Sequence, residues 1–316
     1  MDMMSGGYQS HHAHREGQDT TRSAAFLLSQ GFIIVALAFF NTFFISLSFA
    51  FAVYTYIAAG LPAPEELQTR SLTFASTRIY DRNGRLLYEI IDPQGGRRTQ
   101  VPLAHISPYL RQATIATEDK HFYQHSGVDL IGIARAVWQN VIEQSIVSGA
   151  STIPQQLART VFLSPEEQVQ RTLSRKVKES VLAIEITRRY SRDTILEIYL
   201  NTIYYGNLAY GIEAAAETYF GKTAADLSLA EAALLAGLPQ SPAIYDPFTN
   251  PEAAKARQAI VLGLMAEEGY ITLAQAEAAR SEELQFVTQR TAMRAPHFVT
   301  YVRQLLEQKY GSAVLY

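Results

Sequence analysis

The chain has 316 residues, of which 48% are hydrophobic and 18% are charged, and its formal net charge is -3 at pH 7. Such a composition is typical of a folded protein, and the length suits about two domains. A slightly acidic chain has no general attraction for nucleic acid, so we expect no nucleic-acid partner and only local anion sites. Because the chain has no cysteine and its 7 histidines form no HExxH pattern, we expect no disulfide, thiolate site or zinc site.

A long apolar segment lies near the N-terminus. No charged residue occurs from Ser23 to Pro64, and the apolar run exceeds the about 20 residues that a helix needs to cross a bilayer. The sequence therefore predicts a transmembrane signal anchor over residues 23–60, between a disordered polar tail over residues 1–22 and a proline-containing linker over residues 61–75. A buried core helix is the alternative interpretation of the apolar run.

A mainly α domain is predicted over residues 76–290. It begins with a small β-hairpin, because the residues from Ser76 to Tyr88 alternate apolar and polar around Asn83 and Gly84, a pair favoured in type I′ turns. From Ile106 onward the apolar spacing changes to a period near 3.6, which predicts helices. Residues 291–316 look amphipathic and then extended, and we expect the protein to continue beyond them.

Two adjacent carboxylates, Glu118 and Asp119, stand at the predicted end of a helix and before a glycine-containing loop. A helix end beside a loop is a natural cleft edge. Burial near Phe122 and Tyr123 would raise the pKa of a carboxyl group toward the value that suits a general base. The alternative is that both carboxylates are solvated surface charges.

A polar loop that runs into a helix follows. Ser151 or Thr152 is the expected N-cap, and Gln155 completes a capping box if Thr152 is the cap. The free amides of a helix N-terminus can hold an anion, and Gln155 and Gln156 can bond sugar hydroxyls or acetamido groups. Arg159 follows on the same helix, although capping alone would explain half of this pattern.

A cationic segment comes next. Arg171, Arg175, Lys178 and Glu179 have the spacing i, i+4, i+7 and i+8, which predicts one shared helical face. Such a face could clamp a diphosphate leaving group, because arginine binds phosphate oxygens in a bidentate manner. A merely solvated helix face is the alternative. Further along, an aromatic-rich stretch is expected to serve packing, with Asn201 and Gly221 as helix C-caps.

With these residues in order, the chain resembles the family 51 peptidoglycan glycosyltransferases, the glycosyltransferase domain of class A penicillin-binding proteins, over residues 73–270. The first motif of that family is matched by Glu118, Asp119, Phe122, His125 and Gly127, and the second by Gly149, Ser151, Thr152, Ile153, Gln155, Gln156, Leu157 and Arg159. The third is matched by Arg175, Lys176 and Glu179, and the fourth by Ile195, Leu196, Glu197, Tyr199, Leu200, Asn201 and Gly206. Four motifs in the family order are far more specific than any one of them.

The resemblance implies a lysozyme-like, two-lobed helical domain whose smaller lobe rests in the membrane. The apolar residues Leu130, Ile131 and Ile133 are candidates for lipid contact, and ordinary core packing is the alternative. It implies that lipid II is polymerised with inversion and with release of undecaprenyl pyrophosphate. Glu118 would be the base and Glu179 a second catalytic carboxylate. The positions that would bind substrate are Asp119, His125, Ser151, Thr152, Gln155, Gln156, Arg159, Arg171, Arg175, Lys176 and Asn201.

The same resemblance places the catalytic domain on the outer face of the cytoplasmic membrane. Its partners would be lipid II, the growing lipid-linked glycan, membrane lipid and other cell-wall synthesis proteins. No cofactor is obligatory, although Mg²⁺ or another divalent cation could accompany the diphosphate, and residues 291–316 resemble the start of a linker to a transpeptidase domain. No Ser-x-x-Lys followed by Lys-Thr-Gly is present, so this stretch by itself has no transpeptidase chemistry.

Two rival functions remain open. A lysozyme-like hydrolase or lytic transglycosylase would share the helical architecture and a catalytic glutamate, but it has no pyrophosphate leaving group for a cationic segment to stabilise. A membrane-anchored scaffold would explain the apolar segment and none of the four motifs.

Overall fold

The computed structural model describes residues 10–60, 62–63, 66–67, 69, 76–90, 96–133, 135, 151–287 and 295–310. The chain divides into two compact units, of which the first ends at Gly60 and the second begins at Leu61. Each unit is described by itself.

The first unit is the helix α1 (Ser10–Ala59), whose part from Gln30 to Ala59 has a mean hydropathy of 2.2 and is long and apolar enough to cross a membrane. Large apolar side chains such as Phe32 and Phe44 are exposed along it, whereas a core helix of a soluble protein would bury them. The interpretation as a buried core helix is therefore wrong. The helix also begins upstream of the predicted anchor, so the predicted disordered tail is wrong for residues 10–22, and residues 1–9 lie outside the described residues.

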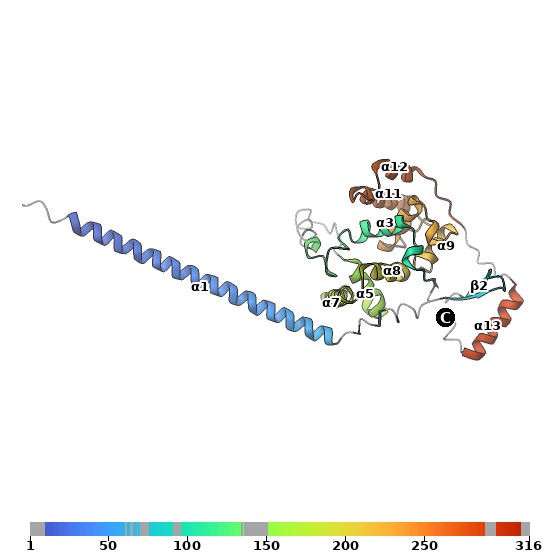
Figure 1. The fold of residues 1–316 in the computed structure, drawn as a ribbon, viewed down its shortest axis with the longest axis horizontal. Coiled ribbons are helices and arrows are strands. Elements are labelled where there is room, and N and C mark those ends of the chain that lie inside the picture. The colour runs from blue at the N-terminus through green and yellow to red at the C-terminus, as the bar shows by residue number, and fades with distance from the viewer. Residues whose placement is uncertain are drawn as a thin grey trace, which may run out of the picture. The chain divides into compact units, whose positions relative to one another are not determined.

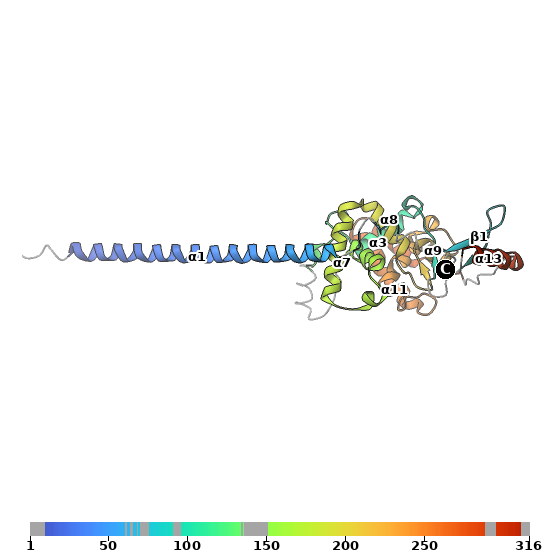
Figure 2. The ribbon, with the colours of Figure 1, turned by 90° about the horizontal axis from the view of Figure 1, so that it is seen from below.

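The second unit is built mainly of helices, which confirms the predicted fold class (Figures 1 and 2). Its first half contains β1 (Thr77–Tyr80), β2 (Leu86–Ile90), β3 (Arg97–Arg98), the 3-10 helix η1 (Leu103–His105), α3 (Pro108–Glu118), α5 (Ile153–Phe162), α6 (Pro165–Val169), α7 (Leu173–Arg189) and α8 (Arg192–Thr202). Its second half contains β4 (Ala209–Tyr210), α9 (Ile212–Phe220), η2 (Ala224–Asp226), α10 (Leu229–Gly237), η3 (Leu238–Gln240), α11 (Pro251–Glu267), α12 (Leu273–Ser281) and α13 (Pro296–Tyr310).

The predicted hairpin is present, with β1 and β2 paired antiparallel, but its turn is not of type I′. A type I′ turn needs positive φ at both central residues, and here Gly84 has φ +77° whereas Asn83 is not among the residues with positive φ. The loop instead closes on Asp81, whose Oδ1 accepts from the backbone amides of Asn83 and Arg85 at 2.8 and 2.9 Å. A longer loop with one left-handed glycine gives the same reversal, which explains why the hairpin was predictable and the turn type was not.

One large core holds the helices of the second unit. Helix α3 packs against α10 and α11, and α5 packs against α7 and α8. Fully buried residues such as Leu110, Leu157 and Ile195 supply about 1.5–3 kcal/mol each by leaving water. Leu67, within the predicted linker, is also completely buried in this core, so that part of residues 61–75 belongs to the domain.

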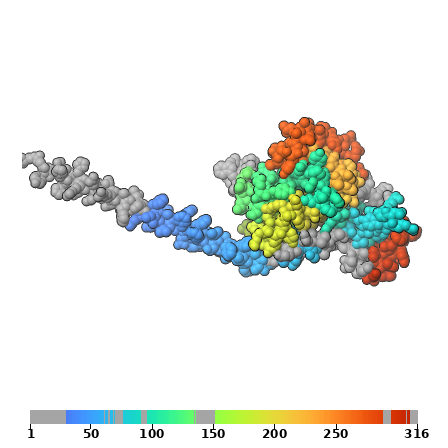
Figure 3. Space-filling model, viewed as in Figure 1, coloured from blue at the N-terminus to red at the C-terminus, as the bar shows by residue number. Residues whose placement is uncertain are grey.

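A second, small core lies between the hairpin and α13, which are drawn side by side in cyan and red (Figure 3). Ile79, Ile90 and Val299 form its centre, with Leu87 and Val302 packed against it. Residues 296–310 are therefore a helix that completes the hairpin's apolar face, while the predicted extended end at residues 311–316 lies outside the described residues.

Candidate active site

The first motif residue stands where α3 ends. Ser107 and Pro108 begin the helix, its apolar face is buried against α10 and α11, and the extended backbone of Asp119 (φ -163°) stops it. Glu118 is thus the last helical residue and is anchored by a buried helix. A carboxylate at a packed helix end is held more firmly than one on a loop.

Glu118 is half-buried, and its Oε2 accepts a hydrogen bond of 2.6 Å from Nε2 of Gln156 on α5. Burial raises the pKa of the Glu118 carboxyl, and the bond from Gln156 and the positive charges of Arg257 and Arg159 act in the opposite direction. A glutamate with a raised pKa that stays hydrogen-bonded in its ionised form suits a general base. The interpretation of Glu118 and Asp119 as solvated surface charges is wrong, because Asp119 is also buried.

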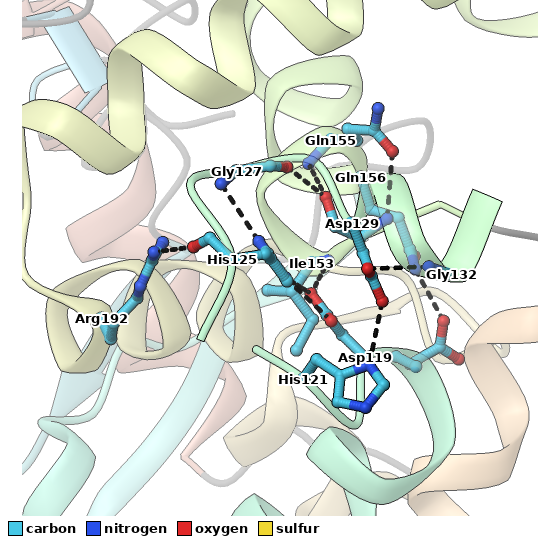
Figure 4. A network of polar contacts seen from close by, with 12 residues as sticks. Asp119, His121, His125, Gly127, Asp129, Gly132, Ile153, Gln155, Gln156 and Arg192 are labelled. Atoms are coloured by element: carbon cyan, nitrogen blue, oxygen red, sulfur yellow. Dashed lines mark hydrogen bonds and ion pairs between the residues drawn. The ribbon is translucent and has the colours of Figure 1, made fainter. Parts of the chain in front are cut away.

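Asp119 organises the loop that follows α3 (Figure 4). Its carboxylate oxygens accept from Nε2 of His125 at 2.9 and 2.8 Å, and Oδ2 also accepts from the backbone amide of Ile153 at 3.0 Å. Nδ1 of His125 accepts from the amide of Gly127 at 3.0 Å, so the proton of a neutral His125 is on Nε2 and points to Asp119. The predicted substrate residues Asp119 and His125 therefore hold the loop on the first turn of α5.

Gly127 lies directly against α7. Its φ is +104°, and a Cβ at this position would stand 2.5 Å from the backbone oxygen of Ala183. Its own carbonyl accepts from Oγ1 of Thr152 at 2.6 Å. Arg192 on α8 donates to the carbonyl of His125 and so supports the other side of the same loop. Only glycine fits this conformation and this close approach.

The predicted capping box at the start of α5 is confirmed, with Thr152 as N-cap and Gln155 as its partner. Gln155 is completely buried, its Oε1 accepts from the Thr152 amide at 3.1 Å, and its Nε2 donates to Oγ of Ser180 at 2.8 Å. The polar atoms of Gln155 are therefore all engaged inside the protein. Gln156, one position further, is the amide that reaches Glu118.

The cations of α7 gather around a buried carboxylate. Nζ of Lys176 lies 2.7 Å from Oγ of Ser151 and 3.2 Å from Oε2 of Glu179, and Nη1 of Arg175 lies 3.5 Å from Oε1 of Glu179. Burial lowers the pKa of Lys176, the charge of Glu179 raises it, and the nearby charges of Arg159 and Arg175 lower it further. One carboxylate thus pairs with two cations, and a bound anion would relieve the repulsion between them.

Arg171 was predicted to share this cluster, but it lies outside it. Thr172 is the N-cap of α7, so Arg171 precedes the helix and is exposed, and the prediction of one shared helical face is wrong for it. Lys178 pairs with Glu167 on α6 at 2.8 Å. Gly149, from the second motif, lies outside the described residues.

Asn201 is a structural amide within α8. Its Oδ1 accepts from the amide of Val101 at 2.9 Å, and its Nδ2 donates to the carbonyls of Val101 and Glu197 at 2.9 and 2.8 Å. The predicted C-cap role is wrong, because α8 continues to Thr202 and Ile203 is the C-cap. Gly221 does end α9 in the left-handed conformation, as predicted.

Two residues near Glu118 were missed by the sequence analysis. Arg257 on α11 acts on the charge of Glu118 more strongly than Arg159 does, and its guanidinium lies 5.7 Å from the ring centre of Tyr245. Tyr199 on α8, interpreted as packing, donates to Oε1 of Gln156 at 3.2 Å. Neither residue is near Glu118 in sequence, so no local sequence pattern predicts that either of them lies close to Glu118 in the fold.

No group of three or more His, Cys, Asp or Glu side chains that could hold a metal ion occurs in the described part of the chain. The expectation that Mg²⁺ or another divalent cation accompanies a bound diphosphate stays a prediction, which rests on the preference of Mg²⁺ for oxygen ligands.

A half-buried glutamate whose raised pKa is opposed by the charges of two arginines, in a helical domain that also carries a cationic cluster, marks a candidate site for acid–base chemistry. The chain belongs to the transglycosylase family, whose family model, described as "Transglycosylase", matches residues 83–266.

Two curated relatives of the chain support this assignment. It is 45% identical over 253 residues to penicillin-binding protein 1A of Neisseria lactamica, covering 79% of this chain and 31% of that protein. It is 44% identical over 255 residues to penicillin-binding protein 1A of Aquifex aeolicus, covering 81% of this chain and 34% of that protein. The crystal structure of penicillin-binding protein 1A from Haemophilus influenzae is similar at 26% identity and a TM-score of 0.43, covering 77% of this chain and 25% of that one. The chain thus spans about a third of the length of these curated relatives.

Proposed function

We propose that this chain is a peptidoglycan glycosyltransferase that polymerises lipid II. In the proposed reaction, the 4-hydroxyl of the acceptor sugar attacks the anomeric carbon of the donor. The bond from that carbon to the pyrophosphate oxygen breaks, the configuration inverts, and undecaprenyl pyrophosphate leaves with the bonding electron pair. Glu118 takes the hydroxyl proton.

The observation that carries the proposal is the environment of Glu118. Its carboxylate ends a buried helix, accepts a 2.6 Å bond from Gln156, and has a pKa that burial raises. A base of this kind is strong enough to take a proton as the hydroxyl attacks, and general base catalysis contributes roughly 10²–10⁴-fold to the rate. Membership in the transglycosylase family supports the same assignment.

The cations suit the leaving group. The positive charge of Arg159 acts on both Glu118 and Lys176, which supports a role for its guanidinium in binding an anionic ligand between them. Lys176, with its pKa lowered mainly by burial, would gain from a second anionic partner besides Glu179. We assign diphosphate binding to Arg159, Arg175 and Lys176, with Arg171 at the exposed margin, and we assign Glu179 to holding these cations in place.

The proposal also includes the membrane. Helix α1 would anchor the protein in the cytoplasmic membrane, with the catalytic domain on the outer face. Leu130 and Ile131 are 74% and 72% exposed, and two adjacent exposed aliphatic residues suit contact with lipid near a lipid-linked substrate. Partners from the cell-wall synthesis machinery belong to the same proposal.

The test uses the full chain in detergent with labelled lipid II and Mg²⁺, and it separates products by size. Glu118→Gln keeps the side-chain volume but removes the base, so we expect long glycan strands from the native chain and a loss of roughly 10²-fold or more in the variant. Glu166→Gln, on exposed α6, is the matched control and should polymerise normally.

Two outcomes would contradict the proposal. Full activity of Glu118→Gln would remove Glu118 from its role. Cleavage of preformed peptidoglycan without polymer formation from lipid II would favour a lytic enzyme instead.

A further inference from the structure

Tyr199 is a buried tyrosine whose hydroxyl points to the side chain of Gln156. It lies on α8, only 1% of its surface is exposed, and its hydroxyl is 3.2 Å from Oε1 of Gln156. Nε2 of the same amide is 2.6 Å from Oε2 of Glu118. One amide therefore connects a core tyrosine on α8 with the glutamate at the end of α3.

The direction of this chain of hydrogen bonds follows from Glu118. An ionised carboxylate only accepts, so the amide must turn its NH₂ group toward Glu118 and its oxygen toward Tyr199. Tyr199 is then the donor of the second bond. Burial, together with the charge of Glu118, raises the pKa of the Tyr199 phenol well above its ordinary value, so it keeps the proton that it donates.

The two oxygens of Glu118 consequently differ. Oε2 is occupied by Gln156, whereas Oε1 forms no hydrogen bond with the described residues. We propose that Tyr199 is a positioning residue that orients Gln156, so that Gln156 holds Oε2 of Glu118 and leaves Oε1 to take the proton of the sugar hydroxyl. The inference rests on the function proposed above.

The proton count is consistent with this arrangement. The O–H bond of the acceptor sugar breaks, and a new O–H bond forms at Oε1 of Glu118. The hydroxyl oxygen of the acceptor sugar then bonds to the anomeric carbon of the donor as the pyrophosphate leaves. Oε2 becomes the carbonyl oxygen of the neutral acid and keeps accepting from Gln156. No proton moves along the chain from Tyr199, whose part is to fix the amide and to polarise it.

The test is Tyr199→Phe in the full chain, assayed with lipid II across a range of pH. Without the phenol donor, the amide is a weaker donor to the carboxylate and free to turn. We expect kcat to fall roughly tenfold, the cost of about one hydrogen bond, with KM little changed. The acidic limb of the pH profile should move to higher pH, because the ionised form of Glu118 loses support.

Tyr205→Phe is the matched control. Tyr205 is also 1% exposed, and burial and the charge of Glu118 raise the pKa of its phenol. Its hydroxyl makes no hydrogen bond with the described residues. Its kcat and pH profile should match those of the native chain. Equal effects of the two substitutions would show that loss of a buried hydroxyl matters and orientation of Gln156 does not, which overturns the inference.

A second variant covers the case in which Tyr199→Phe does not fold. Site-specific 3-fluorotyrosine at position 199 keeps the hydroxyl and makes it a stronger donor, so the acidic limb should move to lower pH. An unchanged limb in a folded, active fluorotyrosine variant overturns the inference. If the native chain itself makes no polymer from lipid II, the proposed function fails, and the positioning role fails with it.

Discussion

The substitution Gly127→Ala tests how closely the loop after α3 must approach α7. The native φ of +104° costs an alanine about 1–2 kcal/mol, because its Cβ crowds the following carbonyl. The new Cβ would also stand 2.5 Å from the backbone oxygen of Ala183, and relieving such an overlap costs about 1–3 kcal/mol. The sum is about 2–5 kcal/mol.

Thermal unfolding of the purified chain measures this cost. In a domain of this size about 1 kcal/mol corresponds to a shift of roughly 2–4 °C, so a loss of about 3 kcal/mol lowers the midpoint by about 6–12 °C. Gly269→Ala is the matched control, because its φ is +75° but nothing lies within 4 Å of the added Cβ. It should lose only the conformational part, about 1–2 kcal/mol.

Activity should fall together with stability in Gly127→Ala. The Gly127 amide donates to Nδ1 of His125, and its carbonyl accepts from Thr152, so a displaced loop disturbs the contacts of Asp119 beside Glu118. Equal shifts of the midpoint in Gly127→Ala and Gly269→Ala would refute the argument from close approach. A stable but inactive Gly127→Ala would instead assign the glycine to substrate binding.

Three further predictions concern the site. The polymerisation rate should fall as the pH drops through the Glu118 pKa, which burial raises above the ordinary 4.5, so a pH profile half-maximal at or below 4.5 would contradict the raised pKa. Arg257→Met removes a positive charge that favours ionised Glu118, so the acidic limb of the same profile should move to higher pH; an unchanged limb would mean that the charge does not reach Glu118. Thr152→Ala should cost about 1–2 kcal/mol in thermal unfolding through the lost N-cap, whereas Thr152→Ser should retain most of it, and equal losses would contradict the capping role.

Local features of the fold were predictable because local chemistry decides them. The capping box of Thr152 and Gln155 and the left-handed Gly221 are formed by residues within one helical turn. The alternation of apolar and polar side chains predicted the hairpin, and the long uninterrupted apolar segment predicted the helix α1. The helical spacing that stops before a glycine-containing loop also predicted the position of Glu118 at a helix end.

Wrong predictions came from residues whose type and spacing fit more than one structural role. Arg171 has the spacing of a helical face, yet Thr172 caps α7 and leaves Arg171 outside it. Asn201 has the composition of a C-cap, yet its amide binds the backbone of Val101, 100 positions away in sequence. The start of α7 at Thr172 decided the position of Arg171, whereas contact with a distant segment decided the role of Asn201.

The sequence by itself determined that this protein has an apolar helix, a mainly α domain and four motifs in a family order. Only the tertiary structure decided which atoms of those motifs meet. The contact of Tyr199 with Gln156 joins residues 43 positions apart, and the charge of Arg257 reaches Glu118 from another helix. The physical reason is that helix formation depends on neighbours within a turn, whereas burial, hydrogen-bond direction and pKa depend on which helices pack together.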